Sequence, residues 1–417
     1  MNQFCCSLYE GVEKLPPGRK AVGYKWVFKL KLNPNNSIAR YKACLVTKGY
    51  SQVLGQDYTE TTSPVACLAS YHAILSLAVK LDLEAHHLNI KTTFLNGTLD
   101  EEIYMKAPNG FTGHSGIWRL LKSLYGLKQA SYIWNKLLDN TLKKLGFNRC
   151  SKDICVYLYK SGNVFVILAV HVDNMLIVLN SKSKLVEIKL GLAQHFKVKD
   201  LGEVKFLLGI EVSQVSRDRQ AGVIKLSQQA YIERLLEQFN LQDVKPASTP
   251  LSPGIRLTQD DCPTTDEGKA DMANVPYASL IGALMYVAIG TRPDIAFAVG
   301  ALSHFLSNPG RCHWSEVKHV LSYLKGTSSY AIRYHSDGSS AGEVVGYSRG
   351  VGMQLTDVLI EGFCDSDWAG CIDTCQSTSG FIWMMNGGAV SWRSKLQMTI
   401  ALSSTEAEYV GATLDIQ

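Results

Sequence analysis

Hydrophobic and polar positions switch along this chain between a period of two and a period near 3.6, which predicts a mixture of strands and helices. Residues 25–32 alternate and are rich in β-forming side chains, and residues 38–46 are β-rich again. The stretch Asn-Pro-Asn-Asn at 33–36 lies between them. Two such runs separated by turn-forming residues predict a β-hairpin.

The middle of the chain holds two continuous apolar runs, 164–170 and 175–179, separated by His-Val-Asp-Asn at 171–174. They predict two buried strands whose connecting tip holds side chains at a fixed, solvent-accessible point. The spacing of apolar residues elsewhere predicts strands at 88–94 and 207–212, and helices at 70–81, 131–145 and 227–239.

Changes in composition mark the predicted domain boundaries. Residues 244–276 contain five prolines and an acidic cluster, which is typical of a linker. Residues 276–325 predict two or three helices, residues 336–352 are Gly- and Ser-rich, and the pattern from 358 predicts strand, loop, strand, strand and helix. The 417 residues fit two to four domains. We predict a first domain at 20–243, a linker at 244–276, a helical connection at 277–335 and a C-terminal domain at 355–417.

The composition, 46% hydrophobic and 19% charged, is that of a soluble globular protein. The net charge of +5 is weak, but its distribution is uneven. Residues 14–48 hold nine basic residues and no acidic one, with Trp26 and Phe28 among them. This basic stretch favours a phosphate-rich partner, although a solvated face is the plainer interpretation.

Eleven cysteines are scattered without the paired spacing of a zinc site. They predict free, buried thiols in a reducing compartment, and a cytoplasmic location is expected. The N-terminus lacks a basic region followed by an apolar run, so no secretory signal is expected. The longest apolar stretches are interrupted by polar residues, so no membrane partner is expected.

Short segments along almost the whole chain match one known family in order and spacing. They include YKWVFKLK from Tyr24, RYKACLVTKGYSQ from Arg40, LNIKTTFLNGTLDEEIYMKAPNGF from Leu88, LKSLYGLKQA from Leu121, DLGEVKFLLGIEV from Asp200, GALMYVAIGTRPDIAFAVG from Gly282, CDSDWAG from Cys364 and ALSSTEAEY from Ala401. The chain resembles the C-terminal part of a copia-type LTR retrotransposon Pol polyprotein, reverse transcriptase followed by ribonuclease H. The resemblance implies an α+β right-hand polymerase fold (fingers, palm and thumb) followed by a truncated ribonuclease H-like α/β domain.

The resemblance implies RNA-directed DNA synthesis at two Mg²⁺ ions, one activating the primer 3′-hydroxyl and one holding the nucleotide. The family carries aspartates where this chain has Asn89 and Asn174, and only Asp173 matches. Mg²⁺ prefers anionic oxygens, and a neutral amide cannot bridge two cations as a carboxylate does. We expect a loss of about 3–6 kcal/mol, roughly 10²–10⁴-fold in rate. Without the matched surroundings, Asp-Asn at a hairpin tip would be ordinary turn chemistry.

Other positions of the nucleotide and primer sites also follow from the resemblance. Phe94 matches the residue that blocks a ribose 2′-hydroxyl, and Tyr125 with Gly126 matches the floor of the nucleotide pocket. Leu208 and Gly209 match the hairpin that grips the primer end.

Two nucleotide-contacting positions lie in the basic stretch. Lys42 is a candidate contact for the nucleotide. Cys44 stands where the family has an arginine that would contact the triphosphate bidentately, which a thiol cannot do.

The C-terminal segment holds two candidate metal ligands of a ribonuclease H site. Asp365 ends a predicted strand and Glu408 lies on a predicted helix. Asp367 and Glu406 are neighbours that stay open as alternatives. A third aspartate is expected on a later strand, and Asp415, on the same helix as Glu408, does not replace it. A missing strand would leave an exposed sheet edge.

Three functional hypotheses, and one that no folded protein accumulates, remain open. The first is a degenerate fragment of a retrotransposon polyprotein with a defective polymerase. The second is a weakly active polymerase that uses Asp173 and substrate phosphates. The third is a non-catalytic protein that binds nucleic acid through phosphates. The expected partners are an RNA/DNA template–primer duplex and dNTPs. For the parent element, a location in virus-like particles or the nucleus is also expected.

Overall fold

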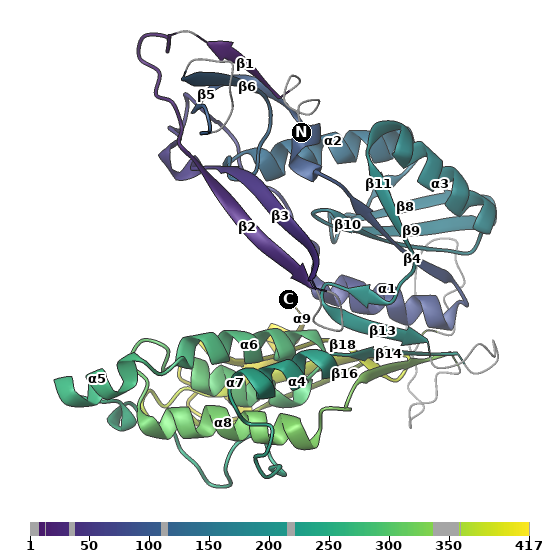
Figure 1. Ribbon diagram of the computed structural model, residues 1–417. Coiled ribbons are helices and arrows are strands. Elements are labelled where there is room, and N and C mark those ends of the chain that lie inside the picture. The colour runs from purple at the N-terminus through teal and green to yellow at the C-terminus, as the bar shows by residue number, and fades with distance from the viewer. Residues whose placement is uncertain are drawn as a thin grey trace. The chain divides into compact units, whose positions relative to one another are not determined.

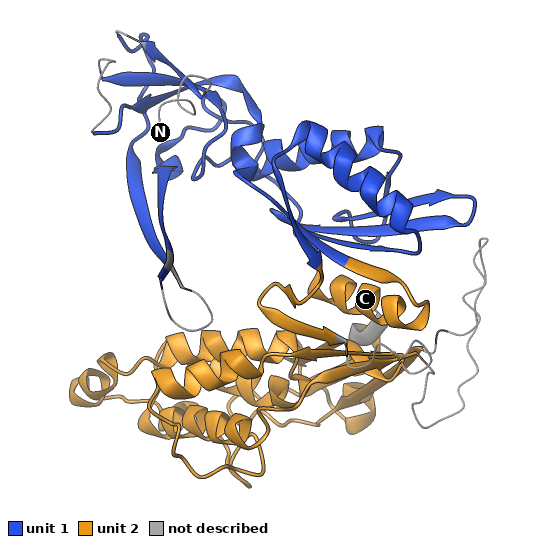
Figure 2. Cartoon of the chain, turned by 45° about the vertical axis from the view of Figure 1, so that its right-hand side comes forward, with its two compact units in different colours: residues 1–66, 86–202 blue, residues 67–85, 203–417 orange. Residues whose placement is uncertain are grey.

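The computed structural model describes residues 8–12, 14–32, 38–109, 116–214, 222–336, 358 and 360–416. Two compact units divide the chain, and Figure 2 colours them separately. Unit 1 comprises residues 1–66 and 86–202, and unit 2 comprises residues 67–85 and 203–417. Helices and sheets occur in both units, so the predicted α+β class is confirmed. The predicted domain boundaries stay a prediction.

Unit 1 contains the predicted hairpin, made of β2 (Tyr24–Leu32) and β3 (Ile38–Thr47). The predicted turn at 33–36 lies outside the described residues. A three-stranded sheet, ordered β1 (Tyr9–Val12), β6 (Ile117–Lys122) and β5 (Thr98–Lys106), packs around Ile103, Met105 and Trp118.

The largest sheet of unit 1 has six strands in the order β11-β4-β10-β9-β8-β7. Their bounds are Val198–Glu203, Glu84–Ile90, Asn174–Leu179, Val164–His171, Val156–Ser161 and Asn148–Arg149. Helices α2 (Ala130–Lys144) and α3 (Lys182–His195) pack on it (Figure 1). Trp134 and Leu138 of α2, one helical turn apart, share a core with Leu168 and Ile177 of the sheet, as helical spacing predicted.

Unit 2 begins with α1 (Leu68–Lys80) and contains a four-stranded and a three-stranded sheet. The first is ordered β12 (Phe206–Leu207), β13 (Ile210–Gln214), β14 (Val223–Ser227) and β15 (Ile332–His335). The second is ordered β16 (Ile360–Ser366), β17 (Thr378–Met385) and β18 (Gly388–Leu396), with α9 (Ser404–Ile416) packed on it.

A helical core fills the middle of unit 2. It joins α4 (Gln229–Gln238), α6 (Tyr277–Gly290), α7 (Ala296–Ser303) and α8 (Arg311–Gly326). The prediction of two or three helices in 276–325 is therefore confirmed. Within the described ranges, no single helix has both the length and the apolar character to cross a membrane; α5 (Asp266–Ala273) and α6 meet that test only as a pair bent by 56°.

Three sequence-based boundaries need correction. The predicted strand at 207–212 is broken by a turn, because Leu208 and Gly209 have φ of 52° and 85°. The strand predicted at 88–94 ends at Ile90, and a 3₁₀ turn, Thr93–Asn96, follows a left-handed Thr92. The predicted linker contains a helix, α5 (Asp266–Ala273), which begins because the Thr265 side chain accepts a hydrogen bond from Gly268 N. The Gly- and Ser-rich stretch predicted as a loop lies almost wholly outside the described residues.

Candidate active site

The three predicted metal-ligand positions of the polymerase come together at one end of the six-stranded sheet. Asn89 lies on β4, and Asp173 and Asn174 lie at the tip that joins β9 to the neighbouring β10. Ile90 N donates a hydrogen bond of 2.8 Å to Asp173 O, which fixes the tip against β4. Residues more than 80 positions apart therefore meet, as the matched motifs implied.

The side chains at this tip form a closed set of hydrogen bonds. Asn89 Nδ2 donates to Asp173 Oδ2 at 2.9 Å and to Asn174 Oδ1 at 3.2 Å. Asn174 Nδ2 donates to Asp173 Oδ1 at 3.2 Å. Both oxygens of the carboxylate therefore accept amide hydrogens. The two amides therefore hydrogen-bond the charged carboxylate of Asp173, which in a metal site would bind cations.

The tip itself is held in an unusual conformation. Val172 has φ of 57°, a left-handed value that a β-branched residue rarely adopts. Trp134, which is 3% exposed, donates its indole hydrogen to Val172 O at 2.8 Å. This anchor from α2 holds the turn, so that Asp173 and Asn174 face β4. The sequence did not predict the hydrogen bond from Trp134 to the tip or the left-handed conformation of Val172.

His87 is another member of this site that sequence analysis missed. Its Nε2 lies 3.1 Å from Asn174 Oδ1. The signal was available in the sequence, because residues two apart on a strand share a face and Asn89 was already a candidate.

Two of the predicted nucleotide-pocket residues are in contact. Phe94 and Tyr125 meet edge to face, with ring centroids 4.9 Å apart. Burial raises the pKa of Tyr125, and the negative charge of Asp173 acts in the same direction. The structure therefore brings Phe94 and Tyr125 together, within the electrostatic influence of Asp173.

Gly126 is where the basic hairpin is attached to the pocket floor. Its φ is 94°, and a Cβ there would lie 2.2 Å from Thr47 O. Thr47, the last residue of β3, donates its backbone and hydroxyl hydrogens to Tyr125 O at 2.8 and 3.0 Å. Only glycine permits this close approach.

The hairpin of β2 and β3 has one basic face. Lys42 lies opposite Lys29, and Cys44 lies opposite Val27 on the same face. Like charges directly opposite one another destabilise a strand pair. An anion bound between them would remove that repulsion. On the other face, Phe28 and Tyr41 are 75% and 79% exposed.

The predicted primer-gripping residues belong to unit 2. Leu208 and Gly209 form the turn between β12 and β13. Tyr286 of α6 donates its hydroxyl hydrogen to Leu208 O at 2.7 Å, and a Cβ at Gly209 would lie 2.3 Å from the Tyr286 hydroxyl oxygen. The turn is thus fixed on the helical core.

The predicted ribonuclease H ligands also lie in unit 2. Asp365 is on β16 and Glu408 is on α9, and both are exposed. Helix α9 packs on β16 so closely that a Cβ at Gly411 would lie 2.2 Å from Ser366 Oγ. Strand β16 forms an edge of its sheet, where Ile360 and Phe363 are 55% and 57% exposed.

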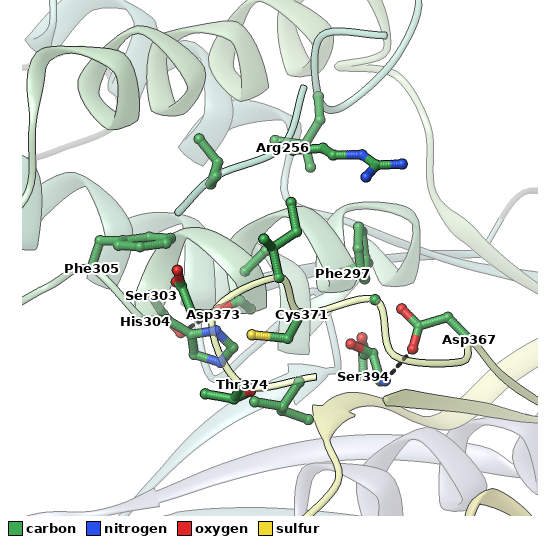
Figure 3. A pocket seen from close by; sticks show the side chains of 18 of the residues that line it. Arg256, Phe297, Ser303, His304, Phe305, Asp367, Cys371, Asp373, Thr374 and Ser394 are labelled. Atoms are coloured by element: carbon green, nitrogen blue, oxygen red, sulfur yellow. Dashed lines mark hydrogen bonds between the residues drawn. The ribbon is translucent and has the colours of Figure 1, made fainter. Parts of the chain in front are cut away.

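The two alternative carboxylates have local structural roles. Asp367 accepts a hydrogen bond from Thr378 N, and Glu406 accepts one of 2.7 Å from Leu402 N. Asp367 also lines a cavity of about 520 Å³ that is bounded by α7 and the loop around Cys371 (Figure 3). Asp373 closes one side of it by accepting hydrogen bonds from Gln259 N. Asp365 and Glu408 are therefore the better candidates.

A comparison with known protein families shows which family this chain belongs to. The family model "Reverse transcriptase (RNA-dependent DNA polymerase)" matches residues 7–253, more than half of the chain. The chain belongs to this reverse transcriptase family. The match includes Asn89, Asp173 and the predicted nucleotide-pocket residues, and their assignment to the polymerase centre stays a prediction.

Curated relatives agree with the family match. The chain is 45% identical over 409 residues to the retrovirus-related Pol polyprotein from transposon TNT 1-94 of Nicotiana tabacum, covering 97% of this chain and 29% of that one. It is 34% identical over 397 residues to the Pol polyprotein from transposon RE2 of Arabidopsis thaliana, covering 94% and 25%. The predicted copia-type resemblance is confirmed. The chain spans less than a third of the length of these relatives.

A solved structure of the foamy viral protease-reverse transcriptase dRH in complex with ds DNA is similar at a TM-score of 0.43 and 10% identity. The similarity covers 94% of this chain and 56% of that one. A score of this size is too low to argue from.

Reverse transcriptases generally use divalent metal ions, and the donors around Asp173 do not fit a pair of them. Only Asp173 is anionic, and both of its oxygens accept amide hydrogens. In the described part of the chain, no group of three or more His, Cys, Asp and Glu side chains is arranged to hold a metal ion.

Proposed function

We propose that this protein is a reverse transcriptase fragment that binds template–primer nucleic acid and dNTPs but extends a primer poorly or not at all. The hydrogen bond from Asn89 Nδ2 to Asp173 Oδ2 carries the proposal. It puts an amide donor where the family places a second carboxylate, so the pair of Mg²⁺ ions loses the anionic oxygens it requires.

Nucleotide binding is supported by the intact pocket around Phe94 and Tyr125. The edge-to-face contact fixes Phe94 against Tyr125, and by resemblance its ring would exclude a ribose 2′-hydroxyl. The position of Cys44 argues for weak binding, because a thiol supplies none of the paired hydrogen bonds that a guanidinium gives a triphosphate.

Nucleic-acid binding is supported by the basic hairpin. Lys29 and Lys42 face each other across β2 and β3. Phosphates bound along this face would replace cation repulsion by attraction, and each neutralised phosphate releases counterions. The exposed Phe28 and Tyr41 on the other face offer rings on which unpaired bases stack.

Salt-dependent binding tests the nucleic-acid part of the proposal. A template–primer with an unpaired overhang is titrated with the native protein, the Lys29→Gln/Lys42→Gln variant and, as control, Lys143→Gln on α2. The affinity of the native protein should fall steeply with salt, and the double variant should show a slope smaller by about two. Salt-insensitive binding, or equal slopes for all three proteins, refutes the role of the hairpin.

A weakly active polymerase is the second candidate, because Asp173 is retained. Primer extension by the native protein in Mg²⁺ and in Mn²⁺ separates the two candidates. Extension at an ordinary polymerase rate of about 1–10³ s⁻¹ would reject the defective assignment. Slow extension seen only in Mn²⁺ would favour the weakly active polymerase.

Ribonuclease H cleavage is proposed only through Asp365 and Glu408, which supply two carboxylates from two elements. The cytoplasmic location, based on the free thiols of the described cysteines, belongs to the same proposal. An RNA–DNA hybrid cleavage assay with Asp365→Asn as control tests the first, and fractionation of cells that express the protein tests the second.

A further inference from the structure

One face of α1 carries two buried polar side chains, His72 and Ser76, four residues apart and therefore one above the other. They are 2% and 0% exposed. Both bond to residues more than 250 positions further along the chain. A buried polar group stabilises a protein only when it has its partners, so these partners decide whether α1 is stable where it lies.

The partner of Ser76 is the turn between β17 and β18. Asn386 and Gly387 have φ of 50° and 80°, the left-handed pair that a two-residue hairpin turn requires. Asn386, 1% exposed, donates Nδ2 hydrogens to Ser76 Oγ at 2.9 Å and to Ser76 O at 3.2 Å. Ser76 Oγ donates in return to Met385 O at 3.1 Å. The turn and the helix therefore exchange hydrogen bonds in both directions, while Asn386 Oδ1 is buried without a hydrogen-bond partner.

The partner of His72 is Tyr334 on β15. The Tyr334 hydroxyl donates its one hydrogen to Ala389 O at 2.7 Å, so it accepts from His72 Nδ1 at 2.8 Å. His335 N donates to Asn386 O at 3.0 Å, and a Cβ at Gly388 would lie 2.5 Å from Arg333 O. Strand β18 is thus joined to α1 directly and also through β15.

These contacts connect segments that the sequence assigns to different parts of the protein. Helix α1 lies inside the match to the reverse transcriptase family, residues 7–253. Strands β17 and β18 lie outside it, in the predicted C-terminal domain. A domain on a flexible linker buries few polar contacts with its neighbours. Here the bonds are buried, reciprocal and geometrically specific.

We propose that the Asn386–Gly387 turn is a latch that locks the C-terminal strands onto α1, so that residues 68–80 and 378–396 open and close as one cooperative element. The C-terminal segment is then an integral support of the polymerase-matching region and does not move as an independent module. This inference does not depend on whether the polymerase centre is active.

Hydrogen exchange on the full chain tests the latch. Asn386→Gly keeps the left-handed turn and removes the side-chain donor. Asn240→Gly is the matched control, because Asn240 has φ of 54° and is exposed in the same unit. In Asn386→Gly, amides of α1 and of β17–β18 should both exchange roughly tenfold faster, and in Asn240→Gly neither should change.

Ser76→Ala removes the hydroxyl through which α1 binds the turn, and it keeps the test valid if Asn386→Gly fails to fold. It should accelerate exchange in β17–β18 as well as in α1. Faster exchange confined to the segment that carries the substitution, in either variant, would show two independent modules and overturn the proposal. Unchanged exchange in both segments would overturn it equally.

Discussion

The side-chain amide of Asn89 lies 2.9 Å from the carboxylate of Asp173 and donates a hydrogen bond to it. A second amide, from Asn174, bonds to the other carboxylate oxygen at 3.2 Å. Neutral amides therefore hydrogen-bond both oxygens of the carboxylate, which keeps its negative charge. A polymerase centre with three carboxylates needs cations to be stable, whereas this one satisfies its charge with protein hydrogens.

Asn89→Asp should make the protein depend on metal for stability. The new carboxylate would face Asp173 at hydrogen-bond distance, so without metal the variant should lose about 1–3 kcal/mol of unfolding free energy. Mg²⁺ should restore part of this loss in the variant and leave the native protein unchanged. Urea unfolding in Mg²⁺ and in EDTA measures the loss of unfolding free energy and its recovery. If Mg²⁺ stabilised the native protein as strongly as the variant, the claim that amide hydrogen bonds replace metal binding at Asp173 would be contradicted.

Gly126→Ala should destabilise unit 1 by about 2–4 kcal/mol, because its Cβ would lie 2.2 Å from Thr47 O at a φ of 94°. Gly162→Ala is the matched control. Gly162 also has a positive φ, 56°, but nothing lies within 4 Å of its Cβ position, so it should cost only about 1 kcal/mol. Equal losses in thermal unfolding would mean that the hairpin is not fixed to the pocket floor.

Cys44→Arg should strengthen nucleotide binding. The new guanidinium would lie on the basic face beside Tyr125 and could pair with a triphosphate, which should tighten dNTP binding about tenfold. Cys44→Leu, which adds bulk without charge, is the control. Titration with a fluorescent dNTP analogue measures the change. The same affinity in all three proteins would show that residue 44 does not contact the nucleotide.

The stability of unit 2 should fall with acidity through His72. Burial lowers the pKa of His72 from 6.5 to about 4, so the unfolded chain binds this proton more readily than the folded one. The contribution is fully present above pH 6.5 and is lost as the pH falls toward 4, by up to about 1.4 kcal/mol per pH unit. The difference between native and His72→Gln unfolding free energies at pH 7 and pH 5 isolates it. A difference that does not change with pH would contradict a buried neutral imidazole.

The periodicity of apolar residues predicted the strands and helices around the polymerase centre. Residues 164–170 and 175–179 became β9 and β10 because a buried strand must be apolar throughout, and their tip emerged at Asp173. The periodicity missed the break at Leu208–Gly209, since a left-handed leucine within an apolar run leaves no periodic signal. The family resemblance had already placed a hairpin there.

Long-range contacts were the second limit of prediction from sequence. The matched motifs placed Asn89 and Asp173 in one site but gave no reason to expect that the amides would bond to the carboxylate. The latch between Ser76 and Asn386 joins residues 310 positions apart, and neither residue has a local feature that indicates the other. A cavity such as the one beside Asp367 forms only when separate segments pack together.

The central claim is that amides at 89 and 174 disable metal-dependent nucleotide addition. Single-turnover addition of one dNTP in Mg²⁺, by the native protein beside the Asn89→Asp/Asn174→Asp variant, tests it most directly. We expect the variant to be faster by roughly 10²–10⁴-fold. Equal rates in the two proteins, with the native protein adding nucleotide at the speed of a working polymerase, would contradict the account.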